Sequence, residues 1–179
     1  MERTAFKAMM FAHRAHRNQR RKYTNAPYTD HLAEVAGIVA TVAPHDVIDV
    51  MVSVAWLHDC VEDQGVEVRA LRLDFGEMVA EGVSELSDLE TGNRAERKRL
   101  SRLRLLASPG WVQTIKCADI ISNTSSITQH DPKFAELYIE ECRLTLTCMT
   151  KADPLLLDLA FSVLSNHAKD NPLLKPAFL

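Results

Sequence analysis

The chain has 179 residues, of which 46% are hydrophobic and 25% are charged, a composition typical of one soluble globular domain. This composition excludes a chain that is disordered throughout, and the net charge of −3 argues against bulk attraction to nucleic acid. No charge-free stretch approaches the roughly 20 residues that a membrane span needs. We therefore expect a soluble, cytoplasmic protein with neither nucleic acid nor a membrane as its partner.

Apolar residues recur with helical period along most of the chain, and only six glycines are present, which favours an all-α fold over a sandwich or barrel. Turn signals such as Thr91-Gly92-Asn93 and Ser108-Pro109-Gly110 separate the segments. We predict a single domain over residues 1–179, with a core of about 4–169 and a short C-terminal tail. The eight or nine expected helices span about 4–19, 30–42, 46–62, 66–75, 77–89, 94–107, 111–128, 132–151 and 154–169.

Four residues are expected to mark helix ends. Asp30, Asp131 and Asp153 each stand before a helical segment, where a carboxylate can accept a hydrogen bond from the first free N–H groups. Gly65 follows the third segment, in the place of a C-terminal glycine.

Polar residues gather at the end of the expected helix over 46–62. The centre of this segment is almost wholly apolar, yet it continues into His58-Asp59 and Glu62-Asp63. On a continuous helix these four side chains fall within one arc, and carboxylates buried together are costly unless a cation is among them. A solvated helix end is the alternative explanation. We interpret the cluster as part of a metal site.

Two further positions can complete such a site. His31 lies at the start of a predicted helix, and Asp119 interrupts an apolar run in which Lys116 and Asn123 share its helical stripe. The predicted ligand set has imidazole nitrogens and carboxylates but no thiolates, and it consists of His31, His58, Asp59 and Asp119. That set suits Mn²⁺, Fe²⁺, Co²⁺ or Zn²⁺. Spacing alone does not connect positions so far apart in the chain.

The order His31…His58-Asp59…Asp119 resembles the H…HD…D pattern of the HD-domain metal-dependent phosphohydrolases. The flanking segments resemble those of RelA/SpoT-type small alarmone hydrolases. The similar segments are Arg20-Arg21-Lys22, Pro27-Tyr28-x-x-His31, residues 58–63 as H-D-x-V-E-D, Phe75-Gly76, residues 96–100 and residues 116–123 as K-x-A-D-x-x-x-N. The resemblance implies an HD-domain helical bundle that lacks the synthetase half of the long family members.

The resemblance also implies an activity. The expected enzyme is a (p)ppGpp 3′-pyrophosphohydrolase that cleaves the 3′ phosphoester to give pyrophosphate and GDP or GTP. A bound Mn²⁺ would activate the attacking water, and Glu62 and Asp63 would orient it or move its proton. The remaining expected roles are metal ligation by His31, His58, Asp59 and Asp119, phosphate binding by Arg21, Lys22 and Lys98, ribose or 3′-phosphate binding by Asn123, and a nucleoside pocket lined by Tyr138.

Two alternatives stay open from the sequence. The same metal site could act on another nucleotide, such as an adenine alarmone, NADPH or a nucleoside phosphate, because arginine-rich pockets bind phosphates well and distinguish bases poorly. The scaffold could also be a non-catalytic module that binds a nucleotide, although the Glu62-Asp63 pair argues against this.

Overall fold

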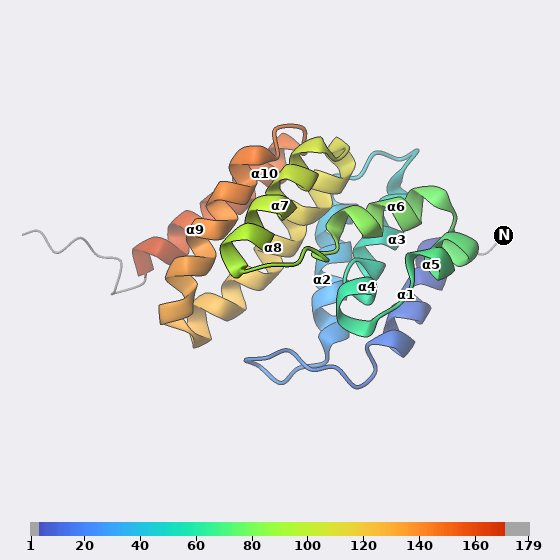
Figure 1. Cartoon of the computed structure of the whole chain (residues 1–179), viewed down its shortest axis with the longest axis horizontal. Helices are drawn as coiled ribbons and strands as arrows, with labels where there is room; N and C mark the ends of the chain where they lie inside the picture. Colours follow the sequence, from blue (N-terminus) through green and yellow to red (C-terminus); the bar gives the residue numbers. More distant parts are fainter. Residues whose placement is uncertain (1–3, 171–179) are drawn as a thin grey trace, which may run out of the picture.

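The computed structural model describes residues 4–170, apart from the side chains at 125 and 167–170, so the expected C-terminal tail lies outside the described residues. The described part folds into ten α-helices, and its only β-type pairing is an isolated bridge between Arg20 and Pro27 (Figure 1). The prediction of an all-α fold is therefore confirmed. The helices are α1 (Thr4–Ala15), α2 (Tyr28–Ala40), α3 (Ile48–Leu57), α4 (Cys60–Gln64), α5 (Val68–Phe75), α6 (Glu77–Leu86), α7 (Arg94–Ala107), α8 (Gly110–His130), α9 (Pro132–Cys148) and α10 (Pro154–Asp170).

Helices α2 and α8 pack against each other in the middle of the bundle. Helix α2 also packs on α3, which contacts α1 and α6, whereas α8 packs on α9 and α10. Figure 1 shows α1 and α3–α6 on one side of this central pair, and α7, α9 and α10 on the other. Apolar side chains from both sides form one cluster, which includes Leu32, Leu57, Ile115 and Leu146. Segments far apart in sequence are thereby held against one another at the α2–α3–α8 contact.

The segment expected as one helix over 46–62 is two helices. Helix α3 ends at Leu57 and α4 begins at Cys60, and both of these residues are buried. In an unbroken helix the Ala55 carbonyl would bond the backbone N–H of Asp59, but here it lies 2.8 Å from Nδ1 of His58. The expectation that His58, Asp59, Glu62 and Asp63 share one arc of a continuous helix was therefore wrong. Their proximity arises from a turn between α3 and α4.

Three of the four expected helix ends are confirmed. Asp131 accepts a hydrogen bond from the N–H of Phe134, Asp153 accepts bonds from the first turn of α10, and Gly65 ends α4 with a φ of 64°. Asp30 is not an N-cap, because α2 already begins at Tyr28 after Pro27. The ring of Pro27 holds φ at −53° and starts the helix, which leaves Asp30 inside the first turn.

None of the helices in the described range is long and apolar enough to cross a bilayer.

Close packing at Gly82 generates a stability prediction. A Cβ atom at this position of α6 would lie 2.5 Å from the Trp111 ring and 2.9 Å from Val54 Cγ2. We expect Gly82→Ala to lower the free energy of unfolding by about 1–3 kcal/mol, because it overpacks the α3–α6–α8 contact. The matched control is Gly37→Ala in α2, where a Cβ meets nothing within 4 Å and the helix gains up to about 1 kcal/mol. Urea unfolding measures both, and equal effects at the two glycines would contradict this packing.

Candidate functional site

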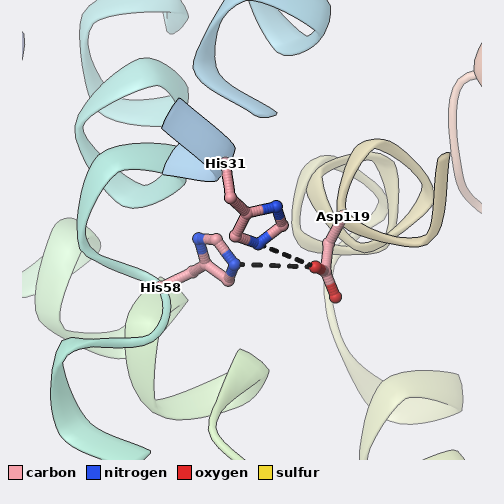
Figure 2. Close-up of side chains that lie close together, drawn as sticks. All are labelled: His31, His58 and Asp119. Atoms are coloured by element: carbon pink, nitrogen blue, oxygen red, sulfur yellow. Dashed lines mark ion pairs between the residues drawn. The ribbon is translucent and has the colours of Figure 1, made fainter. Parts of the chain in front are cut away.

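Two buried imidazoles meet one carboxylate where α2, the α3–α4 turn and α8 come together (Figure 2). The Nε2 atom of His31 lies 3.3 Å from Oδ1 of Asp119, and Nε2 of His58 lies 3.7 Å from the same oxygen. One ligand atom from each of the three residues falls within 4.8 Å of the others. The tertiary fold thus brings together three of the four predicted metal ligands.

Hydrogen bonds on the far side of each ring set its tautomer. Nδ1 of His58 faces the Ala55 carbonyl, which can only accept, so this nitrogen carries the hydrogen. Nδ1 of His31 lies 2.8 Å from the Ser122 hydroxyl, whose own hydrogen is donated to Glu34, so His31 also donates from Nδ1. When the rings are neutral, each Nε2 atom keeps a lone pair, as a metal-binding histidine requires. Burial opposes the charged form of both rings, but Asp59 and Asp119 outweigh burial and raise the pKa of His31 and His58.

The two Nε2 atoms are buried and make no hydrogen bond within the described part of the chain. A buried nitrogen without a hydrogen bond is costly, and two of them facing carboxylates form a site that a divalent cation would satisfy. The site therefore fits a divalent metal ion, with a donor set of imidazole and carboxylate.

Asp59 approaches the same imidazoles from a different side. Its Oδ2 lies 3.0 Å from Nε2 of His58 and 3.5 Å from Nε2 of His31, and it accepts a hydrogen bond of 2.6 Å from the Tyr28 hydroxyl. Asp59 stands outside the compact group formed by the two histidines and Asp119. Burial opposes its ionisation, but the nearby His58 outweighs burial and lowers the pKa of Asp59. Asp59 is thus an ionised neighbour of both rings.

Asp119 is oriented by residues on its own helix. Lys116 donates to its Oδ2 at 2.8 Å, and Asn123 donates to its Oδ1 at 2.7 Å. Burial would raise the pKa of Asp119, but Lys116 and the imidazoles of His31 and His58 hold it well below its ordinary value. Burial would also lower the pKa of Lys116, but Asp119 and Asp88 raise it instead, so both groups stay charged.

A cavity of about 300 Å³ opens beside this cluster. Glu62 and Asp63 line it from α4, and Asp59 and Asp119, the two aspartates that face the histidines, line it as well. The carboxylate of Glu62 accepts a 2.9 Å hydrogen bond from the backbone N–H of Asp88. Desolvation nevertheless raises the pKa of Glu62, with the Asp88 carboxylate adding to the effect. The cavity therefore holds a carboxyl group that is more ready than usual to carry a proton.

The lining of this cavity also includes a cation, an amide and an aromatic ring. Lys98, Asn123 and Tyr138, all predicted as substrate contacts, line this same cavity. Arg21 and Lys22 do not; they line an adjacent cavity of about 220 Å³, which shares Tyr28, Asn123, Ile127 and Phe134 with the first. Nη2 of Arg21 lies 3.3 Å from Oδ1 of Asn123, which links the two cavities.

Several residues of the cavity are absent from the sequence prediction. Arg94 lies over the Phe134 ring at 5.1 Å and pairs with both carboxylate oxygens of Glu141 at 2.7 Å. No local pattern marks Arg94 among the other arginines of its helix. Lys116 is different, because the sequence already placed it on the helical stripe of Asp119 but gave it no role in the site.

Asp88 contacts both Glu62 and Lys98. Its carboxylate accepts hydrogen bonds from Nζ of Lys98 at 2.8 Å, from Ser101 at 2.7 Å and from Arg104 at 2.8 Å. Its backbone N–H holds Glu62. The loop between α6 and α7 therefore ties a predicted acid–base carboxylate to a predicted phosphate-binding lysine.

Comparisons with known proteins show the family of the chain. The family model described as HD domain matches residues 8–144. The human guanosine-3′,5′-bis(diphosphate) 3′-pyrophosphohydrolase MESH1 is 35% identical over 125 residues, which cover 69% of this chain and 69% of that protein. The protein of the same name from Xenopus tropicalis is 32% identical over 139 residues, or 75% of each chain.

Two solved structures share the fold. A metazoan orthologue of SpoT, described as hydrolysing ppGpp, superposes with a TM-score of 0.80 at 24% identity over 97% of this chain and 98% of that one. The protein lmo0812 from Listeria monocytogenes superposes with a TM-score of 0.66 at 21% identity, over 80% of this chain and 97% of that one.

The Asp88 contacts generate a prediction with a defined pH dependence. Burial opposes ionisation of Asp88, but Lys116 and Lys98 outweigh it, so the pKa lies below its ordinary value of 3.8. The ionised group therefore stabilises the fold above pH 3.8, and this contribution is lost as the pH falls through the lowered pKa. We expect Asp88→Asn to lower the free energy of unfolding by about 1–3 kcal/mol at pH 7, with a smaller deficit below pH 4.

Chemical denaturation at the two pH values measures this difference. The matched control is Asp74→Asn, which removes a half-exposed carboxylate 3.6 Å from Nζ of Lys7 and should change the free energy of unfolding by less than about 1 kcal/mol. A deficit in Asp88→Asn that stays constant with pH would contradict the role of its charge.

Proposed function

The chain belongs to the HD-domain family, and on that premise we propose that it is a metal-dependent (p)ppGpp 3′-pyrophosphohydrolase. The reaction would break the bond between the ribose 3′ oxygen and phosphorus, and would release pyrophosphate with GDP or GTP. One observation carries the proposal. A single cavity is lined by the two aspartates beside the buried histidines, by two further carboxylates and by a lysine, in a chain whose MESH1 relatives are named for this reaction; these residues are Asp59, Asp119, Glu62, Asp63 and Lys98.

The ion that we propose is Mn²⁺, held by His31, His58, Asp59 and Asp119. The two unpartnered Nε2 atoms and the ionised carboxylates support this assignment, because Mn²⁺ accepts mixed nitrogen and oxygen ligands. When bound, the ion polarises water and phosphoryl oxygens and lowers the pKa of the water. Ser122 and the Ala55 carbonyl would keep the imidazoles in the tautomer that binds it.

Glu62 would transfer a proton during the reaction, and Asp63 would orient the attacking water. The water oxygen adds to the 3′ phosphorus and leaves with the pyrophosphate, while the ribose 3′ oxygen takes up a proton as its bond to phosphorus breaks. The raised pKa of Glu62 suits it to hold that proton and pass it to the 3′ oxygen. Asp63, on the same wall of the cavity, would orient the water.

The cations and aromatic rings would bind the nucleotide. Lys98 would leave Asp88 for a phosphate oxygen, Arg21 and Lys22 would bind phosphates from the adjacent cavity, and Asn123 would bind the ribose or the 3′ phosphate. Tyr138 would line the nucleoside pocket together with Phe134, whose ring centroid is 6.3 Å away. The substrate would be a small cytoplasmic nucleotide, and the four unpaired cysteines support a reducing compartment.

A substrate panel tests the proposed reaction. We expect the purified protein with added Mn²⁺ to release pyrophosphate from ppGpp and pppGpp, and to lose this activity when the metal is chelated and regain it when Mn²⁺ is restored. The panel includes ppApp, NADPH and nucleoside triphosphates, because stacking on an aromatic ring tolerates any base. Turnover of one of these without turnover of ppGpp would replace the alarmone assignment by another HD phosphohydrolase activity. Binding without any turnover would favour the non-catalytic module.

Two substitutions separate metal binding from proton transfer. We expect Asp119→Ala to lose both bound metal and activity, since it removes a proposed ligand at the centre of the cluster. Glu62→Gln keeps the size of the side chain, so it should retain the metal but lower kcat by about 100-fold or more. Elemental analysis and steady-state kinetics measure these outcomes. Full activity in Glu62→Gln would exclude its proton-transfer role and leave the metal site intact.

A further inference from the structure

We propose that Gln19 is a positioning residue that fixes the carboxylate of Asp63 at the cavity, and that His16 fixes Gln19 in turn. This inference rests on the proposed function, in which Asp63 orients the attacking water. His16 and Gln19 lie in the segment that follows α1, whereas Asp63 belongs to α4. Gln19 thus contacts a residue of the 300 Å³ cavity from a segment that does not itself line that cavity.

The central contact is made by the Gln19 side-chain amide. Its Nε2 donates to Oδ2 of Asp63 at 2.7 Å, and its Oε1 accepts from Nδ1 of His16 at 2.6 Å and from Nε2 of Gln64. A carboxylate can only accept, so the NH₂ group must face Asp63 and the amide oxygen must face His16. Within the described part of the chain, Gln19 is the one side-chain donor to the Asp63 carboxylate.

The buried His16 completes the chain of hydrogen bonds. Since the Gln19 oxygen accepts, Nδ1 of His16 carries the hydrogen and Nε2 keeps its lone pair. That lone pair faces the thiol of Cys60, with Sγ 3.4 Å away. The His16 ring is also stacked on Tyr28, with centroids 5.2 Å apart and an angle of 15° between the planes. Contacts on three sides therefore hold the imidazole in one position.

The backbone of Gln19 is also fixed at both of its polar groups. Its N–H donates to the His16 carbonyl at 2.9 Å, and its carbonyl accepts from the N–H of Tyr28 at 3.1 Å. These two bonds restrain the backbone that carries the Gln19 amide, whereas the Asp63 side chain is exposed at the cavity. Without Gln19 the carboxylate would be free to rotate away from the water that it orients. Glu62 has a separate anchor in the N–H of Asp88, so the two carboxylates are positioned independently.

A double-mutant cycle on Gln19 and Asp63 tests the proposal. Gln19→Leu removes the donor at similar size and should lower kcat about 10-fold, with KM and metal content unchanged, because the contact acts on the water and not on the bound phosphates. In an Asp63→Ala background the same change should have no further effect. An additive loss, or a loss confined to KM or to bound metal, would overturn the proposal. The matched control is Asn18→Leu, at an exposed position in the same turn, which should leave kcat unchanged.

Variants of His16 provide the rescue test. An asparagine at this position can present an N–H close to the place of Nδ1, whereas leucine cannot. We expect His16→Leu to lower kcat severalfold and His16→Asn to restore most of it, with similar thermal unfolding temperatures in the two variants. Equal losses of kcat in both variants would show that His16 matters only for packing, and would remove it from the proposal.

A crystal structure of Gln19→Leu tests the placement without any substrate. We expect the Asp63 carboxylate to leave its parent position or to occupy several rotamers, while Glu62 stays in place. An unmoved Asp63 would overturn the proposal even if ppGpp is hydrolysed. Conversely, a displaced Asp63 in a protein that does not hydrolyse ppGpp would uphold the positioning contact and reject the proposed function.

Discussion

Two buried imidazoles face one carboxylate oxygen, and the rest of the site is arranged around this contact. Nε2 of His31 and Nε2 of His58 lie 3.3 and 3.7 Å from Oδ1 of Asp119, in a place where unpaired polar atoms are costly. The arrangement persists because α2, α3 and α8 pack tightly around it through apolar side chains such as Leu32, Leu57 and Ile115. Hydrophobic packing thus holds together polar atoms that a cation would satisfy.

The groups around this contact are supported from outside the cavity. Ser122 and Glu34 orient His31, and the Ala55 carbonyl orients His58. The loop after α6 holds Glu62 through the N–H of Asp88, and the turn after α1 holds Asp63 through Gln19. Each supporting hydrogen bond restrains a side chain that faces the histidine–aspartate group or the cavity. The site therefore depends on loops as much as on the helices that carry its ligands.

Much of the site could be predicted, and the errors have physical causes. The residue types and the motifs H-D-x-V-E-D and K-x-A-D-x-x-x-N are local features of the sequence, so they can be recognised without knowledge of how the helices pack. The break between α3 and α4 could not be predicted from the sequence, because the apolar pattern continues through Leu57 to Cys60. The Ala55 carbonyl contacts the His58 ring in place of a helical backbone N–H, and no sequence pattern indicates that contact. Arg94 was missed because its position over Phe134 depends on how α7 packs on α9.

The sequence by itself determined the helical class, the capping aspartates at 131 and 153, and the identity of the residues able to bind a metal. These follow from periodicity, backbone chemistry and ligand chemistry, which act over a few residues. Only the tertiary structure decided that His31, His58 and Asp119 meet. It also decided that Lys98 lines a cavity with Asp119 while Arg21 lines the adjacent one, and that Gln19 contacts Asp63. Contacts between residues tens of positions apart depend on how the helices pack, and helical periodicity identifies a buried face without identifying what covers it.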